Sequence, residues 1–215
     1  MIAATSRSSR VASAPRCYLA LGDSFSAGID AGSETPWPEA VANDLRRASP
    51  RLRFANLASV GATSQAVLDD QLPHAAGLQP DLVSLICGAN DVLLSVRPDV
   101  DAFERRLDEL VSRLDMLESR PLVVTATYPD LATFLPLRPR TAERVAAGLA
   151  AVNEAVRRVS SAHGAHCLEW AGHSGVADRE NFADDDFHPS PIGHKRAAAA
   201  FAEGLSDKLP LGPDL

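Results

Sequence analysis

Short apolar runs alternate with amphipathic stretches along most of this chain. Five of these runs are expected to form strands: 17–21, 52–57, 82–87, 122–126 and 165–168. Each run is almost continuously apolar instead of alternating with period two, which is typical of strands buried on both faces of a parallel sheet. Strands that alternate with helices predict an α/β protein, a three-layer α/β/α sandwich around a mostly parallel five-stranded sheet.

The stretches between these runs carry helical patterns. Apolar residues recur at three- and four-residue steps over 100–117 and again over 145–159, which predicts two long amphipathic helices. Shorter helices are expected over 38–48 and 64–72, and an Ala-rich helix over 191–209. In this last helix, the proline at the first position is favourable because its missing N–H is not needed there.

The length and charge of the chain limit what it can be. With 215 residues it suits one domain, which we expect over 17–210, between a disordered leader (1–16) and a short tail (211–215). The leader lacks the apolar run of a secretory signal, which favours a cytoplasmic location. A net charge of -7 without a basic tract argues against nucleic acid as a partner. No stretch reaches the ~20 apolar residues of a membrane span.

Polar and small residues follow the ends of the predicted strands. Ser24, Gly61, Asn90 and Tyr128 come after the first four strands in turn, and His188 lies in the loop after the fifth. In open α/β sheets, binding sites form outside the carboxyl ends of the strands. We therefore expect these residues to converge.

The first of these turns reads Gly-Asp-Ser-Phe-Ser-Ala-Gly over 22–28. It fits neither the dinucleotide fingerprint Gly-x-Gly-x-x-Gly nor a phosphate loop, which needs a Lys after its second Gly. What remains is Ser24 in a tight turn at a strand end. A serine alone is weak evidence, since most serines are solvated or cap a helix, and a nucleophilic serine needs an adjacent base.

A candidate base lies in the acidic segment 184–189. Asp185 precedes His188 by three residues, which allows the carboxylate to fold back onto the imidazole and fix its tautomer. The other imidazole nitrogen would then accept the Ser24 proton. The alternatives are a solvated acidic loop or a metal site, and the metal site is disfavoured because consecutive residues seldom point at one ion.

Three neutral hydrogen-bond donors complete this chemistry. Asn90, in Gly-Ala-Asn-Asp over 88–91, offers a side-chain amide, while Gly61 and Ser24 offer backbone N–H groups. Such donors stabilise the oxyanion of a tetrahedral intermediate. Taken singly, Asn90 could be a turn residue and Gly61 a turn with positive φ.

These segments, taken together, resemble the GDSL-type esterases and lipases, also called SGNH hydrolases. Four blocks appear in the family's order: 22–28, Gly61 after an Asn-x-Ala stretch, 88–91, and 185–189. The resemblance extends from about residue 17 to residue 209. One departure is that Phe25 stands where the name-giving motif has Leu.

The resemblance implies a flavodoxin-like SGNH hydrolase fold and a role for each matching residue. Ser24 would be the nucleophile, His188 the general base and Asp185 the carboxylate that orients it, while Ser24, Gly61 and Asn90 would form the oxyanion hole. No metal or organic cofactor is implied. The reaction would be hydrolysis of small-molecule carboxylic esters through an acyl-enzyme. Thioester cleavage, sugar deacetylation and acyl transfer would use the same residues, and a non-catalytic binding module is disfavoured by the intact motif.

Apolar residues near these motifs are candidates for a substrate pocket that would suit short or medium acyl chains. They are Phe25, Val92, Leu93, Tyr128, Phe134 and Leu135. The last three belong to a Pro-rich segment, 128–140, which is typical of a pocket wall or a lid. The alternative is that these side chains pack in the hydrophobic core and do not contact a substrate. Nothing in the sequence indicates an oligomeric state.

Overall fold

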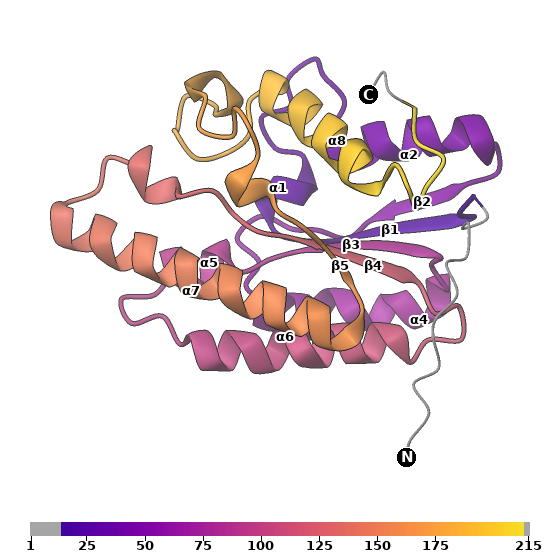
Figure 1. Cartoon of the computed structure of the whole chain (residues 1–215), viewed down its shortest axis with the longest axis horizontal. Coiled ribbons are helices and arrows are strands. Elements are labelled where there is room, and N and C mark those ends of the chain that lie inside the picture. Colours follow the sequence, from indigo (N-terminus) through magenta and orange to yellow (C-terminus); the bar gives the residue numbers. More distant parts are fainter. Residues whose placement is uncertain (1–13, 213–215) are drawn as a thin grey trace.

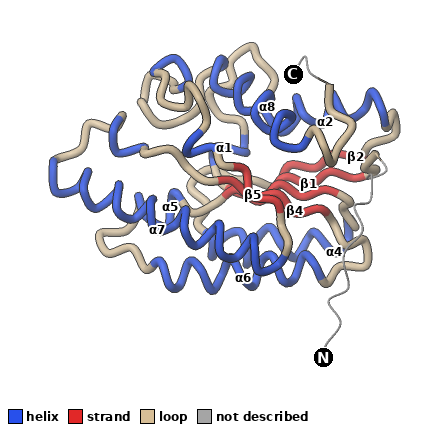
Figure 2. The backbone as a smooth tube through the Cα atoms, viewed as in Figure 1, coloured by secondary structure: helices blue, strands red, loops and turns tan. Residues whose placement is uncertain are grey.

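Five parallel strands form the centre of the computed structural model, which describes residues 14–212 (Figures 1 and 2). They are β1 (Cys17–Gly22), β2 (Arg53–Asn56), β3 (Leu82–Ile86), β4 (Leu122–Ala126) and β5 (His166–Leu168). Their order in the sheet is β2-β1-β3-β4-β5, with every neighbouring pair parallel. This is the flavodoxin-like order, whose ligand sites lie where the winding direction reverses, next to β1. The predicted fold class is confirmed.

Helices cover both faces of this sheet (Figure 1). On one face lie α1 (Ser24–Ala27), α2 (Trp37–Ala48) and α8 (Pro191–Leu205), and on the other α4 (Ala75–Leu78), α5 (Ala89–Leu93), α6 (Val100–Asp115) and α7 (Pro139–His163). The loops after β4 and β5 contain short 3₁₀ helices: η3 (Leu131–Thr133), η4 (Trp170–Gly172) and η5 (Arg179–Asn181). All six residues of β1 are buried, as expected for a central strand covered on both faces.

The predicted helix over 64–72 is the main difference in secondary structure. The chain there forms α3 (Ser64–Ala66), a π-helical turn η1 (Val67–Gln71) and a 3₁₀ turn η2 (Leu72–His74), followed by α4. Pro73 cannot donate a backbone hydrogen bond, which disfavours a regular helix through this point. The wide π turn also brings Gln71 into the interior, where it is 3% exposed.

At both ends, the described fold makes contacts with residues just outside the range expected for the domain, 17–210. Residues 1–13 of the expected leader and 213–215 of the expected tail are outside the described residues. Arg16, however, donates its N–H to Asp81, and Gly212 donates its N–H to Asp44, at 2.8 and 2.6 Å. Arg16 and Gly212, which flank the expected range 17–210, are thus both hydrogen-bonded to residues within it.

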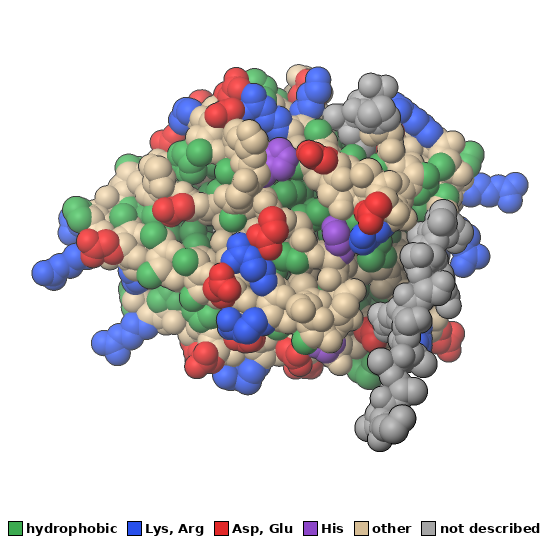
Figure 3. Space-filling view, in the orientation of Figure 1, with side chains coloured by type: hydrophobic (Ala, Val, Ile, Leu, Met, Phe, Trp, Pro, Cys, Tyr) green, Lys and Arg blue, Asp and Glu red, His purple; other side chains and the backbone are tan. Residues whose placement is uncertain are grey.

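Charged side chains of both signs are interspersed on the face drawn in Figure 3, and no basic patch stands out on the described part of it. Within residues 14–212, no helix has the length and apolar character needed to cross a bilayer.

The end of β1 meets β3 at very close range. Gly22 pairs with Ile86, and its φ of 141° lies in the region that favours glycine. A Cβ on Gly22 would lie 2.0 Å from the carbonyl oxygen of Ile86. Because this oxygen also accepts the N–H of Asp23, at 3.2 Å, the strand cannot move away without breaking that bond. Only glycine fits at this point.

We therefore expect Gly22→Ala to destabilise the protein by at least about 3 kcal/mol, through backbone strain and overpacking. Gly77→Ala is the matched control, since Gly77 is exposed in α4 and a Cβ there meets nothing within 4 Å. This control should gain about 0.5–1 kcal/mol by the helix propensity of Ala. Urea unfolding of the two variants measures both effects. Equal stability of Gly22→Ala and the wild type would contradict the close-approach argument.

Candidate active site

Ser24 is the first residue of α1, directly after β1. Its neighbour Asp23 caps the helix, with a side-chain oxygen that accepts the N–H of Phe25 at 3.1 Å. The helix ends after one turn at Gly28, whose φ of 86° is left-handed. Ser24 is only 3% exposed. The tight turn predicted from the sequence therefore holds the serine at the carboxyl edge of the sheet.

Two side chains from other elements fix the backbone of this turn. The indole N–H of the fully buried Trp37 donates to the carbonyl of Phe25 at 2.9 Å. The amide of Asn56, at the end of β2, donates to the carbonyl of Ser26 at 2.8 Å. Both bonds satisfy carbonyls that a one-turn helix leaves open.

Gln71 is a positioning residue that the sequence did not reveal. Its side-chain amide pairs with the backbone of Gly22 in both directions: Gly22 N–H donates to Oε1, and Nε2 donates to the Gly22 carbonyl, each at 2.8 Å. Nε2 also lies 3.3 Å from the hydroxyl of Ser59. The Gln71 amide thus makes the two backbone hydrogen bonds to Gly22 that a neighbouring strand would otherwise make. A buried Gln at the end of an irregular helix carries no recognisable sequence signal.

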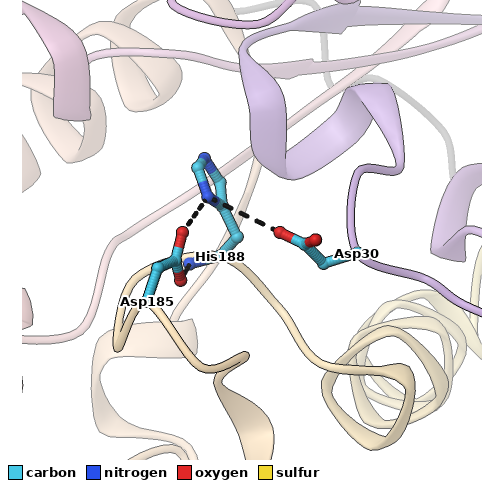
Figure 4. Close-up of side chains that lie close together, drawn as sticks. All are labelled: Asp30, Asp185 and His188. Carbon is cyan, nitrogen blue, oxygen red and sulfur yellow. Dashed lines mark hydrogen bonds and ion pairs between the residues drawn. The ribbon is translucent and has the colours of Figure 1, made fainter.

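His188 lies between Ser24 and Asp185. Its Nε2 is 3.0 Å from Ser24 Oγ, and its Nδ1 is 2.5 Å from Asp185 Oδ2. Asp185 Oδ1 accepts the backbone N–H groups of Phe187 and His188, at 3.0 and 2.9 Å. Figure 4 shows how Asp185 lies against the imidazole of His188. Burial opposes ionisation of Asp185, but these hydrogen bonds outweigh it and lower the pKa of the carboxyl. The structure therefore brings together the three residues predicted to form a triad.

A short hairpin shapes the segment that carries Asp185 and His188. The N–H of Ala183 donates to the carbonyl of His188 at 2.8 Å, and Phe182 pairs with Pro189 in an antiparallel bridge. The Asp and the His therefore lie within one closed turn. This explains why the carboxylate can contact both the imidazole and the backbone of His188.

Donor groups of Ser24, Gly61 and Asn90 lie at the ends of three adjacent strands, β1, β2 and β3. Ser24 begins α1, so its N–H has no partner within the helix. No hydrogen bond within residues 14–212 uses the Gly61 N–H, and Gly61 has a φ of 76°. Asn90 donates one amide hydrogen to the carbonyl of Ala62 at 3.0 Å, which leaves its second one available.

The loop that carries Gly61 is anchored on both sides. On one side, Ser59 N–H donates to the Gly22 carbonyl at 3.1 Å. On the other, Asp91 accepts the N–H and the hydroxyl of Ser64, at 2.8 and 2.5 Å. These contacts connect the loop after β2 to the ends of β1 and β3, so that the position of Gly61 relative to Ser24 is fixed by the fold.

A cavity of about 480 Å³ opens beside Ser24 and His188, between α8 and the loops after β4 and β5. Its wall is mainly apolar and aromatic, formed by Phe25, Tyr128, Leu131, Trp170, Val176, Phe182, Phe187, Ala197 and Ala200. Charged side chains of Asp178, Arg196 and Glu203 also line it. The volume lies within the range of ligand pockets.

Only two of the six predicted pocket residues, Phe25 and Tyr128, line this cavity. The prediction is wrong for Val92 and Leu93, which belong to α5. Val92 is fully buried and lies against Gly148 of α7, so it is part of the core. It is also wrong for Phe134 and Leu135. Phe134 stacks on Phe182 with ring centroids 4.4 Å apart, so it supports the cavity wall from behind.

Asp23 is an ionisable group buried beside the proposed nucleophile. It is 2% exposed, and Tyr128 donates its hydroxyl to Asp23 Oδ2 at 3.2 Å. Burial raises the pKa of Asp23 to about 7, although the hydrogen bonds from Phe25 and Tyr128 oppose the shift. Burial and the nearby Asp23 charge also raise the pKa of Tyr128, so its phenol stays protonated.

Among the described residues, one cluster of side chains offers ligand atoms for a metal ion: Asp30, Asp185 and His188. Their ligand atoms lie within 4.8 Å of one another. His188 Nδ1 already contacts Asp185, so a cation there would have to compete with that hydrogen bond.

The raised pKa of Asp23 makes stability depend on pH. Its stabilising contribution is fully present below about pH 4, the usual Asp pKa, and is lost as the pH rises through about 7. Asp23→Asn should therefore be more stable than the wild type at pH 8, by up to about 4 kcal/mol, with a smaller difference at pH 5. Asn still caps α1, and its amide can donate to Tyr128. Urea unfolding at the two pH values measures this.

Asp99→Asn is the control for this experiment. Asp99 is an exposed residue that caps α6 by accepting the N–H of Ala102 at 2.9 Å. It should show no gain between pH 5 and pH 8. A pH-independent difference between Asp23→Asn and the wild type would count against ionisation of a buried Asp23.

Comparison with known proteins shows the fold and the family of the chain. No protein with a curated description matches the chain. Solved structures with the same fold include a lipase/acylhydrolase from Enterococcus faecalis (21% identical, TM-score 0.67, covering 93% of this chain and 99% of that chain). A catalytic mutant of an acetylxylan esterase from Geobacillus stearothermophilus is 19% identical (TM-score 0.70, covering 88% and 94%). A psychrotrophic esterase from Pseudoalteromonas sp. is 18% identical (TM-score 0.66, covering 89% and 97%). The sequence pattern of the GDSL-like lipase/acylhydrolase family matches residues 20–196, and the chain therefore belongs to that family.

Proposed function

We propose that the protein is a serine esterase that cleaves carboxylic esters with short to medium acyl chains through an acyl-enzyme. One observation carries the proposal: His188 contacts Ser24 at 3.0 Å through one nitrogen and Asp185 at 2.5 Å through the other. Hydrogen bonds in this order are what activate a serine hydroxyl. Membership in a lipase/acylhydrolase family supports ester hydrolysis in general.

Each step of the proposed reaction is carried out by a side chain or backbone group of the site. Ser24 Oγ attacks the acyl carbonyl while His188 Nε2 takes the hydroxyl proton. The N–H groups of Ser24 and Gly61 and the free amide hydrogen of Asn90 stabilise the oxyanion. His188 then protonates the leaving alcohol. A water molecule, deprotonated by the same nitrogen, attacks the acyl carbon, the bond to Ser24 Oγ breaks to release the acid, and His188 returns the proton to Ser24 Oγ. Asp185 orients the imidazole and stabilises its charged form.

The cavity beside Ser24 supports an apolar acyl group of limited size. Its mainly apolar wall stabilises the burial of methylene groups, and its volume of about 480 Å³ limits their number. The side chains of Asp178, Arg196 and Glu203 offer hydrogen bonds at the same cavity, and this favours deacetylation of sugars as the second candidate. Thioester cleavage and acyl transfer would use the same catalytic residues.

Hydrolysis of p-nitrophenyl esters tests the main proposal. Ser24→Ala should lose at least about 10³-fold in kcat, because the nucleophile is absent. Ser26→Ala is the matched control, since the Ser26 hydroxyl is buried without a hydrogen-bond partner among the described residues and its removal should not lower activity. The wild type, but not Ser24→Ala, should form a covalent adduct with a fluorophosphonate. An active Ser24→Ala, or a wild type without an adduct, would overturn the proposal.

The cavity assignment makes a separate prediction about chain length. Ala200 of α8 lines the cavity, so Ala200→Leu should fill part of it. We expect kcat/KM to fall at least about tenfold for octanoate esters, with little change for acetate esters. A panel that includes acetylated sugars and thioesters separates the alternatives. An equal effect of Ala200→Leu on all acyl lengths would exclude the cavity as the acyl site.

A further inference from the structure

Asp30 lies beside the same imidazole nitrogen that Asp185 contacts. Its Oδ2 is 3.8 Å from Nδ1 of His188, against 2.5 Å for Asp185 Oδ2. The two carboxylates approach Nδ1 from different segments, Asp30 from the loop after α1 and Asp185 from the loop before α8 (Figure 4). A separation of 3.8 Å is an ion-pair distance but too long for a hydrogen bond. His188 therefore faces two carboxylates and hydrogen-bonds one of them.

The backbone around Asp30 is held in an uncommon conformation. Asp30 has a φ of 58°, a left-handed value that few non-glycine residues adopt. Its neighbours keep it there: the carbonyl of Ile29 lies 2.9 Å from Nε2 of the buried His194, and Ala31 is 6% exposed. Backbone strain that the surroundings maintain is found mainly at functional sites.

The Asp30 carboxylate has one partner within residues 14–212. It makes an ion pair with His188 and no hydrogen bond to another described residue. Asp185, in contrast, is fixed by two backbone N–H groups as well as by the imidazole. Asp30 is half exposed and can move towards Nδ1 without breaking another contact.

We propose that Asp30 is a second carboxylate partner of His188. It is a positioning residue that shares with Asp185 the stabilisation of the imidazolium, which forms when His188 takes the proton of Ser24. This inference rests on the proposed function, because that proton transfer is part of it. When Asp185 is removed, Asp30 is the nearest acceptor for the Nδ1–H and takes over part of its role.

Other charged groups near His188 are engaged elsewhere. The remaining ionisable side chains of the cavity are Asp23, His173, Asp178, Arg196 and Glu203. Within the described residues none of them hydrogen-bonds His188. Arg196 pairs with Asp178 at 3.1 Å, and His173 contacts Glu203 at 3.3 Å. Asp23 is bonded to Tyr128. Asp30 and Asp185 are therefore the carboxylates that act on Nδ1.

A double-mutant cycle on kcat/KM tests the proposal in the active enzyme. Asp30→Asn is suitable because Asn tolerates a left-handed backbone. Alone, it should cost at most about threefold, whereas in an Asp185→Ala background it should cost a further tenfold or more. Glu34→Gln removes the same charge from an exposed position of the same loop and should have no effect in either background. Equal losses from Asp30→Asn in both backgrounds would overturn the proposal.

NMR detection of the His188 Nδ1–H tests the same contact without any substrate. In Asp185→Ala this proton should remain protected from exchange with water, because Asp30 is then its acceptor, and adding Asp30→Asn should remove the protection. Adding Glu34→Gln instead should leave the signal unchanged. Equal exchange of this proton with and without Asp30 would refute the contact even if the ester assays fail. Inactivity and missing fluorophosphonate labelling of the wild type, with a signal that depends on Asp30, would refute the proposed function and keep the Asp30 contact.

Discussion

The close backbone contact between Gly22 of β1 and Ile86 of β3 fixes the position of Ser24, around which the rest of the site is arranged. Because a Cβ does not fit at Gly22, the end of β1 is fixed against β3, and Ser24 follows it immediately. On the side of Gly22 that faces away from β3, the side chain of Gln71 bonds the backbone N–H and carbonyl of Gly22. The turn that carries Ser24 is therefore set by sheet pairing, and the serine does not depend on its own one-turn helix for its position.

Much of the fold could be predicted from the pattern of apolar runs. The apolar runs of β1, β3 and β4 are almost entirely buried, and such runs are typical of a parallel sheet covered on both faces. The edge strands β2 and β5 are more exposed and their runs contain polar residues. The helix predicted over 64–72 is present in irregular form, as a short α-helix followed by a π turn, and this turn places Gln71 against the end of β1. This tertiary contact of Gln71 has no counterpart in the periodicity of the sequence.

The candidate catalytic residues were easier to predict than the cavity beside them. Ser24, Gly61 and Asn90 each follow a strand of the parallel sheet, so the topology alone brings them together. His188 and Asp185 lie within one turn, where sequence spacing is a direct measure of distance. The cavity has no such rule. Its wall includes Ala197 and Ala200, whose small side chains look like ordinary helix formers, and its existence depends on how α8 meets the loop after β5.

The arrangement of charge around Ser24 is asymmetric, and this asymmetry suits the proposed reaction. Asp30 and Asp185 both lie on the imidazole side, where positive charge would develop. The neutral donors of Gly61 and Asn90 lie on the side of β2 and β3, where negative charge would develop. Asp91, which follows Asn90 in the chain, is engaged by Ser64 and lies 3.7 Å from Arg106, which compensates its charge. The buried carboxyl of Asp23 accepts hydrogen bonds from Phe25 and Tyr128. In the proposed reaction, the charged imidazole would therefore face carboxylates, and the oxyanion would face neutral donors from other loops.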